Sequence, residues 1–223
     1  MTSPEIRSRG SELLVAVPVG SCEQHGPHLP LWTDSLVAAT LCDALAEARS
    51  DVAVAPLVGV GASGEHAGFA GTLSVGSPFL AAYLTELVRS SRTWSRGTVF
   101  VSGHGGNLDA LREVQRTADE EGDDVVTYLP TVPGGDAHAG HTETSLIAAI
   151  DDDQVRHNVL VTGNLTPLAE LAPALRRDGV AAVSPTGVLG DPTTASALQG
   201  RRVLDELVAD LLDVVTTRFG APR

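Results

Sequence analysis

Short apolar runs alternate with segments of helical periodicity along the chain, and this alternation constrains the fold more than any other feature. Each run has the length and composition of a buried strand. Strands that alternate with helices favour a mostly parallel sheet covered by helices on both faces, so we predict an α/β fold of this kind. The runs lie at residues 13–20, 52–58, 98–102 and 124–129.

The segments between and after the runs carry apolar residues at the spacing of amphipathic helices. Ser77, followed by Pro78, and Asn107 are suitable N-cap residues for two of these helices. The pattern of residues 154–165 is ambiguous. The helices are expected at residues 34–49, 77–92, 108–121, 142–150, 168–177 and 194–219.

Length and charge narrow the class of protein. The chain has 223 residues and a formal net charge of −13. This length favours one domain over residues 1–223. An acidic surface repels the phosphates of nucleic acids and of anionic membranes, so we expect neither as a partner. The N-terminus has no apolar signal region, no run approaches the ~20 residues of a membrane span, and two cysteines are too few for a disulfide framework. We therefore expect a cytoplasmic protein.

The first polar motif follows the first apolar run. Glu23 and His25 would point the same way if the extended conformation persists, and Asp34 opens the next helix. Two carboxylates and an imidazole within twelve residues make a plausible half of a metal site. The alternative is a polar loop in which Asp34 is only the N-cap of the helix.

The second motif, SGHGGN at residues 102–107, follows the third run. Glycines around His104 leave space beside the imidazole, as a ligand or catalytic base needs. The alternative is a Gly-rich turn that happens to include a histidine. Nucleotide binding by this loop is not favoured, because neither common phosphate-binding glycine pattern is present.

The third motif is DAHAGHTETS at residues 136–145. His138 precedes a predicted helix and could act as an acid or base. Glu143 lies in the first turn of that helix, where an interaction with the helix dipole is the alternative role. His28 and His66, in loops rich in Pro and Gly, could line the pocket. No GxSxG elbow is present, and the acidic neighbourhood of Cys22 argues against a cysteine nucleophile.

Five segments together resemble the creatininase family of metal-dependent amidohydrolases. They follow the order of the family and span most of the chain. The resemblance implies a three-layer α/β/α sandwich, a two-metal centre and a homo-oligomer. The segments are PVGSCEQHGPHLPLWTD (18–34), GEHAGFAGTLSVG (64–76), SGHGGN (102–107), HAGHTETS (138–145) and SPTGVLGDP (184–192).

The resemblance also implies roles for individual residues. Glu23, Asp34 and His104 would hold one divalent metal ion. His25 and Asp34 would hold the second ion, with Asp34 bridging the two. His138 would donate a proton to the leaving nitrogen. Glu, Asp and His ligands suit Zn²⁺, Fe²⁺ or Mn²⁺, and no thiolate selects among these metals.

The chain departs from the family pattern at two site positions. Members that hydrolyse creatinine carry a ligating Glu two residues after the histidine of the second motif, where this chain has Gly106. Glu143 is the natural substitute as the fifth ligand. The family often has Glu at the position of His141, so His141 could be a ligand or could line the substrate pocket. Trp32 and Trp94 are the only tryptophans and neither lies in the 130–142 loop, so creatinine is not the expected substrate.

Within the family, residues 61–76 look most like members that trim a modified C-terminal Val-Tyr unit from a precursor peptide during redox-cofactor maturation. We therefore expect a modified precursor peptide as the substrate. Deformylation of a formamidopyrimidine, or hydrolysis of another cyclic amide, is the alternative within the family. A metal-free scaffold or binding subunit is the alternative of another class.

Overall fold

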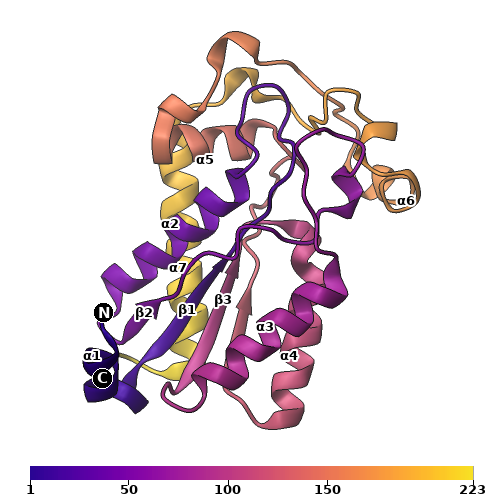
Figure 1. The fold of residues 1–223 in the computed structure, drawn as a ribbon. Coiled ribbons are helices and arrows are strands. Elements are labelled where there is room, and N and C mark those ends of the chain that lie inside the picture. The colour runs from indigo at the N-terminus through magenta and orange to yellow at the C-terminus, as the bar shows by residue number, and fades with distance from the viewer. Residues whose placement is uncertain (223) are drawn as a thin grey trace.

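A four-stranded parallel sheet forms the centre of the structure, a computed structural model that describes residues 1–222 (Figure 1). The strand order is β2-β1-β3-β4, and every neighbouring pair is parallel. This confirms the parallel sheet predicted from the apolar runs. The strands are β1 (Leu14–Val19), β2 (Val52–Val54), β3 (Gly97–Ser102) and β4 (Val125–Tyr128).

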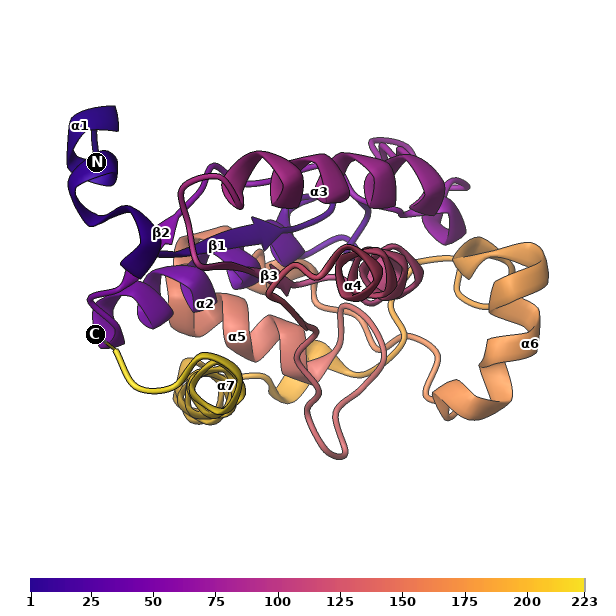
Figure 2. The same ribbon diagram turned by 90° about the horizontal axis from the view of Figure 1, so that it is seen from below.

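Helices cover both faces of this sheet, as the sequence predicts (Figure 2). The first face packs against α2 (Thr33–Ala48), α5 (His141–Asp151) and α7 (Ala197–Phe219), and the second against α3 (Ser77–Ser91) and α4 (Leu108–Glu121). The fold is therefore a three-layer α/β/α sandwich. Two further helices, α1 (Ser3–Arg9) and α6 (Leu168–Asp178), lie to the sides of these layers.

The apolar runs are continuous because both faces of the central strands are buried. In β1, Leu14 and Ala16 join the core on the side of α2, whereas Val15 and Val17 join the core beneath α3 and α4. All four side chains are buried. Alternate residues of a strand point to opposite faces, so a strand covered on both sides needs an apolar residue at every position.

Three local expectations need correction. The second strand ends at Val54 rather than at residue 58. Ala55 N–H still donates to Ala16 O at 2.8 Å, but the next bond to β1 comes from Val58 N–H, which donates to Pro18 O at 2.9 Å, one residue later than a regular ladder requires. The N-cap of α3 is Gly76, and Ser77 is the first helical residue. Asn107 precedes α4, but its side chain makes no capping hydrogen bond.

No helix within residues 1–222 is both long and apolar enough to cross a membrane.

A buried ion cluster ties the C-terminal end of α7 to the end of α2 and the start of β3. Arg49 is only 1% exposed and donates to the Asp51 carboxylate at 2.9 Å and to Gly220 O at 3.0 Å. Arg96 also pairs with Asp51 and donates to Phe219 O at 2.9 Å. One buried carboxylate thus pairs with both guanidinium groups that hold the end of the last helix.

The Asp51 cluster gives a prediction for stability. Asp51→Asn should lower the free energy of unfolding by about 3–5 kcal/mol, because it leaves two guanidinium groups without their counter-charge. Urea unfolding at pH 7 measures this. Asp205→Asn, on the exposed face of α7, is the matched control and should change stability by less than about 0.5 kcal/mol. Equal stability of the two variants would contradict the role given to the cluster.

The contribution of the Asp51 cluster to stability should depend on pH. Burial raises the pKa of Asp51, but Arg49 and Arg96 outweigh it and hold this pKa below its usual 3.8. A carboxyl group with a lowered folded-state pKa stabilises the fold above its unfolded-state pKa and loses that contribution as the pH falls through the folded value. The stability gap between wild type and Asp51→Asn should therefore shrink below about pH 4.

Candidate metal centre

The polar motifs meet at the carboxyl ends of β1 and β3, where the loops gather at the top of Figure 1. Glu23 and His25 follow β1, His104 follows β3, and Glu143 lies in the first turn of α5. Parallel strands bring their carboxyl ends to one edge of the sheet, so motifs far apart in the sequence come together there. The structure thus joins the three motifs that the sequence analysis singled out.

Asp34 lies between two imidazoles. Its Oδ1 is 3.4 Å from His25 Nε2, and its Oδ2 is 3.3 Å from His104 Nδ1. Ser21 Oγ donates to Oδ2 at 2.6 Å and so orients the carboxylate. The N-cap of α2 is Trp32, and Asp34 is already within the helix. The capping role is therefore excluded, and Asp34 is placed to bridge two sites.

Two glycines allow the start of α2 to come this close to the strand ends. A Cβ atom on Gly103 would lie 2.1 Å from the carbonyl oxygen of Asp34, and one on Gly20 would lie 2.1 Å from Ser35 Oγ. Only a residue without a side chain fits at either position. The glycines after β1 and β3 thus fix Asp34 between His25 and His104.

Several buried polar atoms in this cluster have no hydrogen-bond partner among the described residues. They include both carboxylate oxygens of Glu23 and Nε2 of His25. The other ring nitrogen of His25, Nδ1, lies 3.1 Å from the carbonyl oxygen of Glu23, so Nδ1–H donates there, and Nε2 faces the acids and could bind a metal ion once it has lost its proton. Unpaired buried acceptors are costly, and a bound cation would satisfy them. These residues therefore fit a metal ion.

Glu143 and His138 complete the side of the cluster next to His25. Glu143 Oε2 is 3.8 Å from His25 Nε2 and 4.0 Å from His138 Nδ1. The same oxygen accepts the amide hydrogen of Ala139 at 2.6 Å. Ala139 has a φ of +50°, in the left-handed region of backbone conformation. This conformation is unfavourable for any residue that has a side chain. This turn keeps His138 and Glu143 on the same side of the site.

Three groups of side chains have ligand atoms close enough to share an ion. In each group the atoms lie within 4.8 Å of one another. The first two include every ligand expected from the sequence, and the third adds His66, which was expected only to line a pocket. The groups are Glu23, Asp34 and His104; His25, His138 and Glu143; and Glu23, His66 and His138.

Burial and charge shift the pKa values of these groups in opposite directions. Burial raises the pKa of Glu23 to about 8 and that of Glu143 to about 7. Burial alone would lower the pKa of His25, but the Asp34 and Glu143 carboxylates outweigh it and raise this pKa to about 9. The cluster therefore holds protons at neutral pH, and a metal ion would have to displace them.

Three further histidines differ in how they relate to the ligand groups: His28 and His141 lie outside all three groups, and His66 belongs to the third. His28 is buried and its Nε2 lies 2.9 Å from Thr144 Oγ1, so it joins the first loop to α5. His141 Nδ1 lies 3.1 Å from Thr194 Oγ1, and His141 belongs to none of the three ligand groups. His66 Nδ1 accepts from Gln24 Nε2 at 2.9 Å, and its Nε2 lies 3.3 Å from Glu23 Oε1.

Three residues that the sequence analysis did not assign to the site hold it together. Gln24 contacts His66, and its backbone oxygen lies 2.8 Å from His138 Nε2. Asn107 accepts from Ala62 N–H at 2.9 Å and donates to Gly20 O at 3.1 Å, so its amide joins two loops instead of capping α4. Glu65 Oε1 lies 3.4 Å from His104 Nε2. The position of Gln24 between Glu23 and His25 was the only sequence signal among the three.

Two cavities reach the cluster from either side of Gly105. The smaller, about 200 Å³, is bounded by Asp34 and Glu143 and by the loop at 129–137. The larger, about 1020 Å³, lies between Glu65 and helices α4 and α6. None of the described residues that line either cavity is aromatic.

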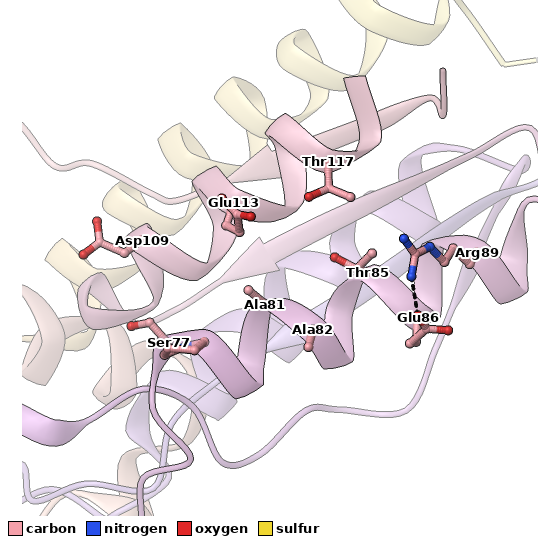
Figure 3. Close-up of a pocket in the computed structure, with 10 residues that line it drawn as sticks. Ser77, Ala81, Ala82, Thr85, Glu86, Arg89, Asp109, Glu113 and Thr117 are labelled. Atoms are coloured by element: carbon pink, nitrogen blue, oxygen red, sulfur yellow. Dashed lines mark hydrogen bonds and ion pairs between the residues drawn. The ribbon is translucent and has the colours of Figure 1, made fainter. Parts of the chain in front are cut away.

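A separate groove of about 570 Å³ runs between α3 and α4 (Figure 3). Its lining includes the ion-paired Glu86 and Arg89 and small residues such as Ala81. None of the ligand candidates lines it.

Fold and site together define a parallel α/β protein with a buried cluster of acids and imidazoles at the ends of its strands. The creatininase family model, described as creatinine amidohydrolase, matches residues 1–215. The chain therefore belongs to the creatininase family. A mycofactocin precursor peptide peptidase of Mycolicibacterium smegmatis is 50% identical to it over 205 residues, which cover 90% of this chain and 83% of the relative.

Solved structures agree with this family. A crystal structure of a creatinine amidohydrolase superimposes with a TM-score of 0.81 and 25% identity, covering 98% of this chain and 96% of the other. A mutant creatininase of the Zn-Zn type has a TM-score of 0.80 at 24% identity over the same shares of the two chains. The likeness to the second structure bears on the fold alone.

The close approach at Gly103 gives a prediction for the site. Gly103→Ala should push the start of α2 away and lower the free energy of unfolding by about 1–3 kcal/mol. Metal retained after dialysis, measured by elemental analysis, should fall because Asp34 moves. Gly105→Ala is the control, since a Cβ there would meet nothing within 4 Å. If both variants kept the same metal content and stability, the glycine would not position Asp34.

Proposed function

We propose that this chain is a metal-dependent peptidase that cleaves the modified C-terminal Val-Tyr unit from the mycofactocin precursor peptide during redox-cofactor biosynthesis. The observation that carries the proposal is the 50% identity to the M. smegmatis peptidase across 90% of this chain. The segments that bear the ligand candidates all lie within the matched family region.

The site supports a centre of two divalent metal ions. Glu23, Asp34 and His104 would hold one ion, and His25, Asp34 and Glu143 the other. Asp34 directs one oxygen toward each imidazole, as a bridging ligand must. Carboxylates and imidazoles accept Zn²⁺, Fe²⁺ or Mn²⁺. His141 makes its contact with Thr194, which favours Glu143 as the fifth ligand.

Ions held by these residues would supply the positive charge that polarises the scissile carbonyl and activates water. Glu143 could accept the proton of that water through the carboxylate oxygen that does not hold an ion. His138 Nδ1, 4.0 Å from Glu143 Oε2, can carry that proton to the leaving nitrogen. Burial lowers the pKa of His138 well below its usual value, so protonated His138 would release its proton readily.

The shape of the site supports a chain-like substrate. The two cavities that meet at Gly105 let a substrate extend on both sides of the cluster. The wall of the larger cavity combines glycines and alanines with charged side chains such as Arg112 and Arg176, and neither cavity has an aromatic platform for a flat ring. The loops at 59–77 and 130–141 each contribute residues to one of them.

We also propose that the chain acts in the cytoplasm as a homo-oligomer and as one domain over residues 1–223. Phe79 and Tyr83, one turn apart on α3, are 63% and 45% exposed, and Leu73 just before this helix is 58% exposed. Contact between copies along this side of α3 would remove these apolar side chains from water.

The shared ligand gives a direct prediction. Asp34→Asn should lose both ions and nearly all turnover, because one substitution weakens both sites, while the fold is retained. Elemental analysis after dialysis and circular dichroism measure this. Asp43→Asn, at an exposed position of α2, is the control and should keep wild-type metal. Wild-type metal content in Asp34→Asn would remove Asp34 from the centre.

The substrate gives a second prediction. Metal-loaded protein should release the Val-Tyr-derived product from the decarboxylated, cross-linked precursor peptide, detected by mass spectrometry. Chelator-treated protein and Asp34→Asn should release none. Turnover of a formamidopyrimidine nucleotide without peptide cleavage would favour the deformylase alternative. Binding of the peptide without metal and without cleavage of either substrate would favour a scaffold.

A further inference from the structure

The smaller of the two cavities beside the metal cluster has a wall rich in apolar side chains. It measures about 200 Å³ and lies between the loop at 129–137 and helices α2, α5 and α7. Asp34 and Glu143 line it and also belong to the groups of ligand candidates. The wall further contains apolar side chains larger than alanine, which are Val37, Leu129, Pro130, Val132, Leu146 and Leu207.

The acids in this wall leave the apolar part of the cavity free. Asp136 accepts the amide hydrogens of His141 and Thr142, the second at 3.0 Å, so its charge is directed at the free amides in the first turn of α5. Asp34 is 2% exposed, whereas the side chain of Glu143 is 24% exposed. Glu143 is therefore the ligand candidate that the cavity reaches, and the cavity joins this edge of the metal cluster to an apolar wall.

The smaller cavity ends against the core of the protein. Val37, Leu146 and Leu207 are buried and belong to the apolar core on this face of the sheet, so a chain that enters from the metal cluster cannot continue past them. The larger cavity, about 1020 Å³, lies between Glu65 and helices α4 and α6 and has charged side chains such as Arg112 in its wall. The long part of a peptide therefore fits the larger cavity, and the end of the peptide fits the smaller one.

Its volume limits what the smaller cavity can hold. Cavities that enclose a whole drug-sized ligand measure about 300–1,000 Å³, and this cavity is below that range. It has room for one apolar side chain rather than for both residues of a Val-Tyr unit. In the proposed substrate, the residue that directly follows the scissile bond is derived from valine. Its aliphatic group is the part of the released unit nearest to the metal centre, and its burial against an apolar wall is favourable.

We propose that the smaller cavity is the pocket for the aliphatic, valine-derived group of the released unit, and that the larger cavity holds the rest of the precursor peptide. This inference rests on the function proposed above. It gives the bound substrate a direction, with its C-terminal end toward α7 and its remaining chain between α4 and α6. It also gives the site a preference, because a charged residue after the scissile bond would be buried against an apolar wall.

The test uses the two products as separate ligands of the metal-loaded protein: the released unit, and the precursor peptide shortened by that unit. Isothermal titration calorimetry measures the Kd of each. Val132→Phe fills the smaller cavity from a half-buried position in its wall and should weaken binding of the released unit at least about tenfold. Binding of the shortened peptide should change by less than about twofold, because it lies on the other side of the cluster.

Two further variants complete the design. Leu129→Phe fills the same cavity from a second half-buried position and should act like Val132→Phe. Ala172→Phe is the matched control, since Ala172 is a half-buried residue in the wall of the larger cavity. It should weaken binding of the shortened peptide and leave the affinity for the released unit unchanged. Circular dichroism identifies a variant that does not fold, and the other variant of the smaller cavity then decides.

The other outcomes separate the pocket from the proposed function. If wild-type protein cleaves the precursor peptide but folded Val132→Phe and Leu129→Phe bind the released unit as wild type does, the pocket is refuted and the function stands. If these variants weaken binding of the shortened peptide instead, the direction of the substrate is opposite to the one proposed. Wild-type protein that neither cleaves the precursor peptide nor binds either product would refute the function, and the pocket with it.

Discussion

The site depends on how the buried negative charge at the strand ends is neutralised. Glu23 and Asp34 are almost completely buried, and Glu143 lies against the same imidazoles. Burial raises the pKa of Glu23 to about 8, and the nearby acids raise the pKa of His25 to about 9. Protons can therefore neutralise the cluster when no cation is bound, and protons and metal compete for the same atoms. This competition lets one set of side chains serve a folded metal-free chain and a metal centre.

Helix α2 connects this cluster to the rest of the fold. At its first turn, Asp34 is held against the strand ends by the close approach of Gly103. At its last turn, Arg49 is bound by Asp51 and by the end of α7. The helix is therefore fixed at both ends, and its buried face packs on the sheet in between. A carboxylate that must serve two imidazoles needs such support, because a small shift of the helix would favour one imidazole over the other.

The sequence predicted the sheet and its helices, because these depend on the short-range periodicity of apolar residues. It also predicted that the motifs meet, because parallel strands bring their carboxyl ends to one edge of the sheet. It assigned His25 to the metal site and His28 to the substrate pocket, but only the fold shows that His28 is directed toward Thr144 and His25 toward Asp34. Asn107 was assigned a local capping role, but a contact with residue 62 outweighs that role. Glu65 carried no local signal, because its place beside His104 is set by that long-range contact.

The absence of a side chain at Gly106 shapes the space beside His104. It makes room for the Glu65 carboxylate, and the neighbouring Gly105 lines both cavities. A small flat substrate gains affinity from walls that enclose it, usually aromatic ones. An extended chain instead needs an open path past the reacting atoms and backbone groups along that path. Gly106 therefore suits the extended substrate that we propose, because it adds no side chain to the wall of the larger cavity.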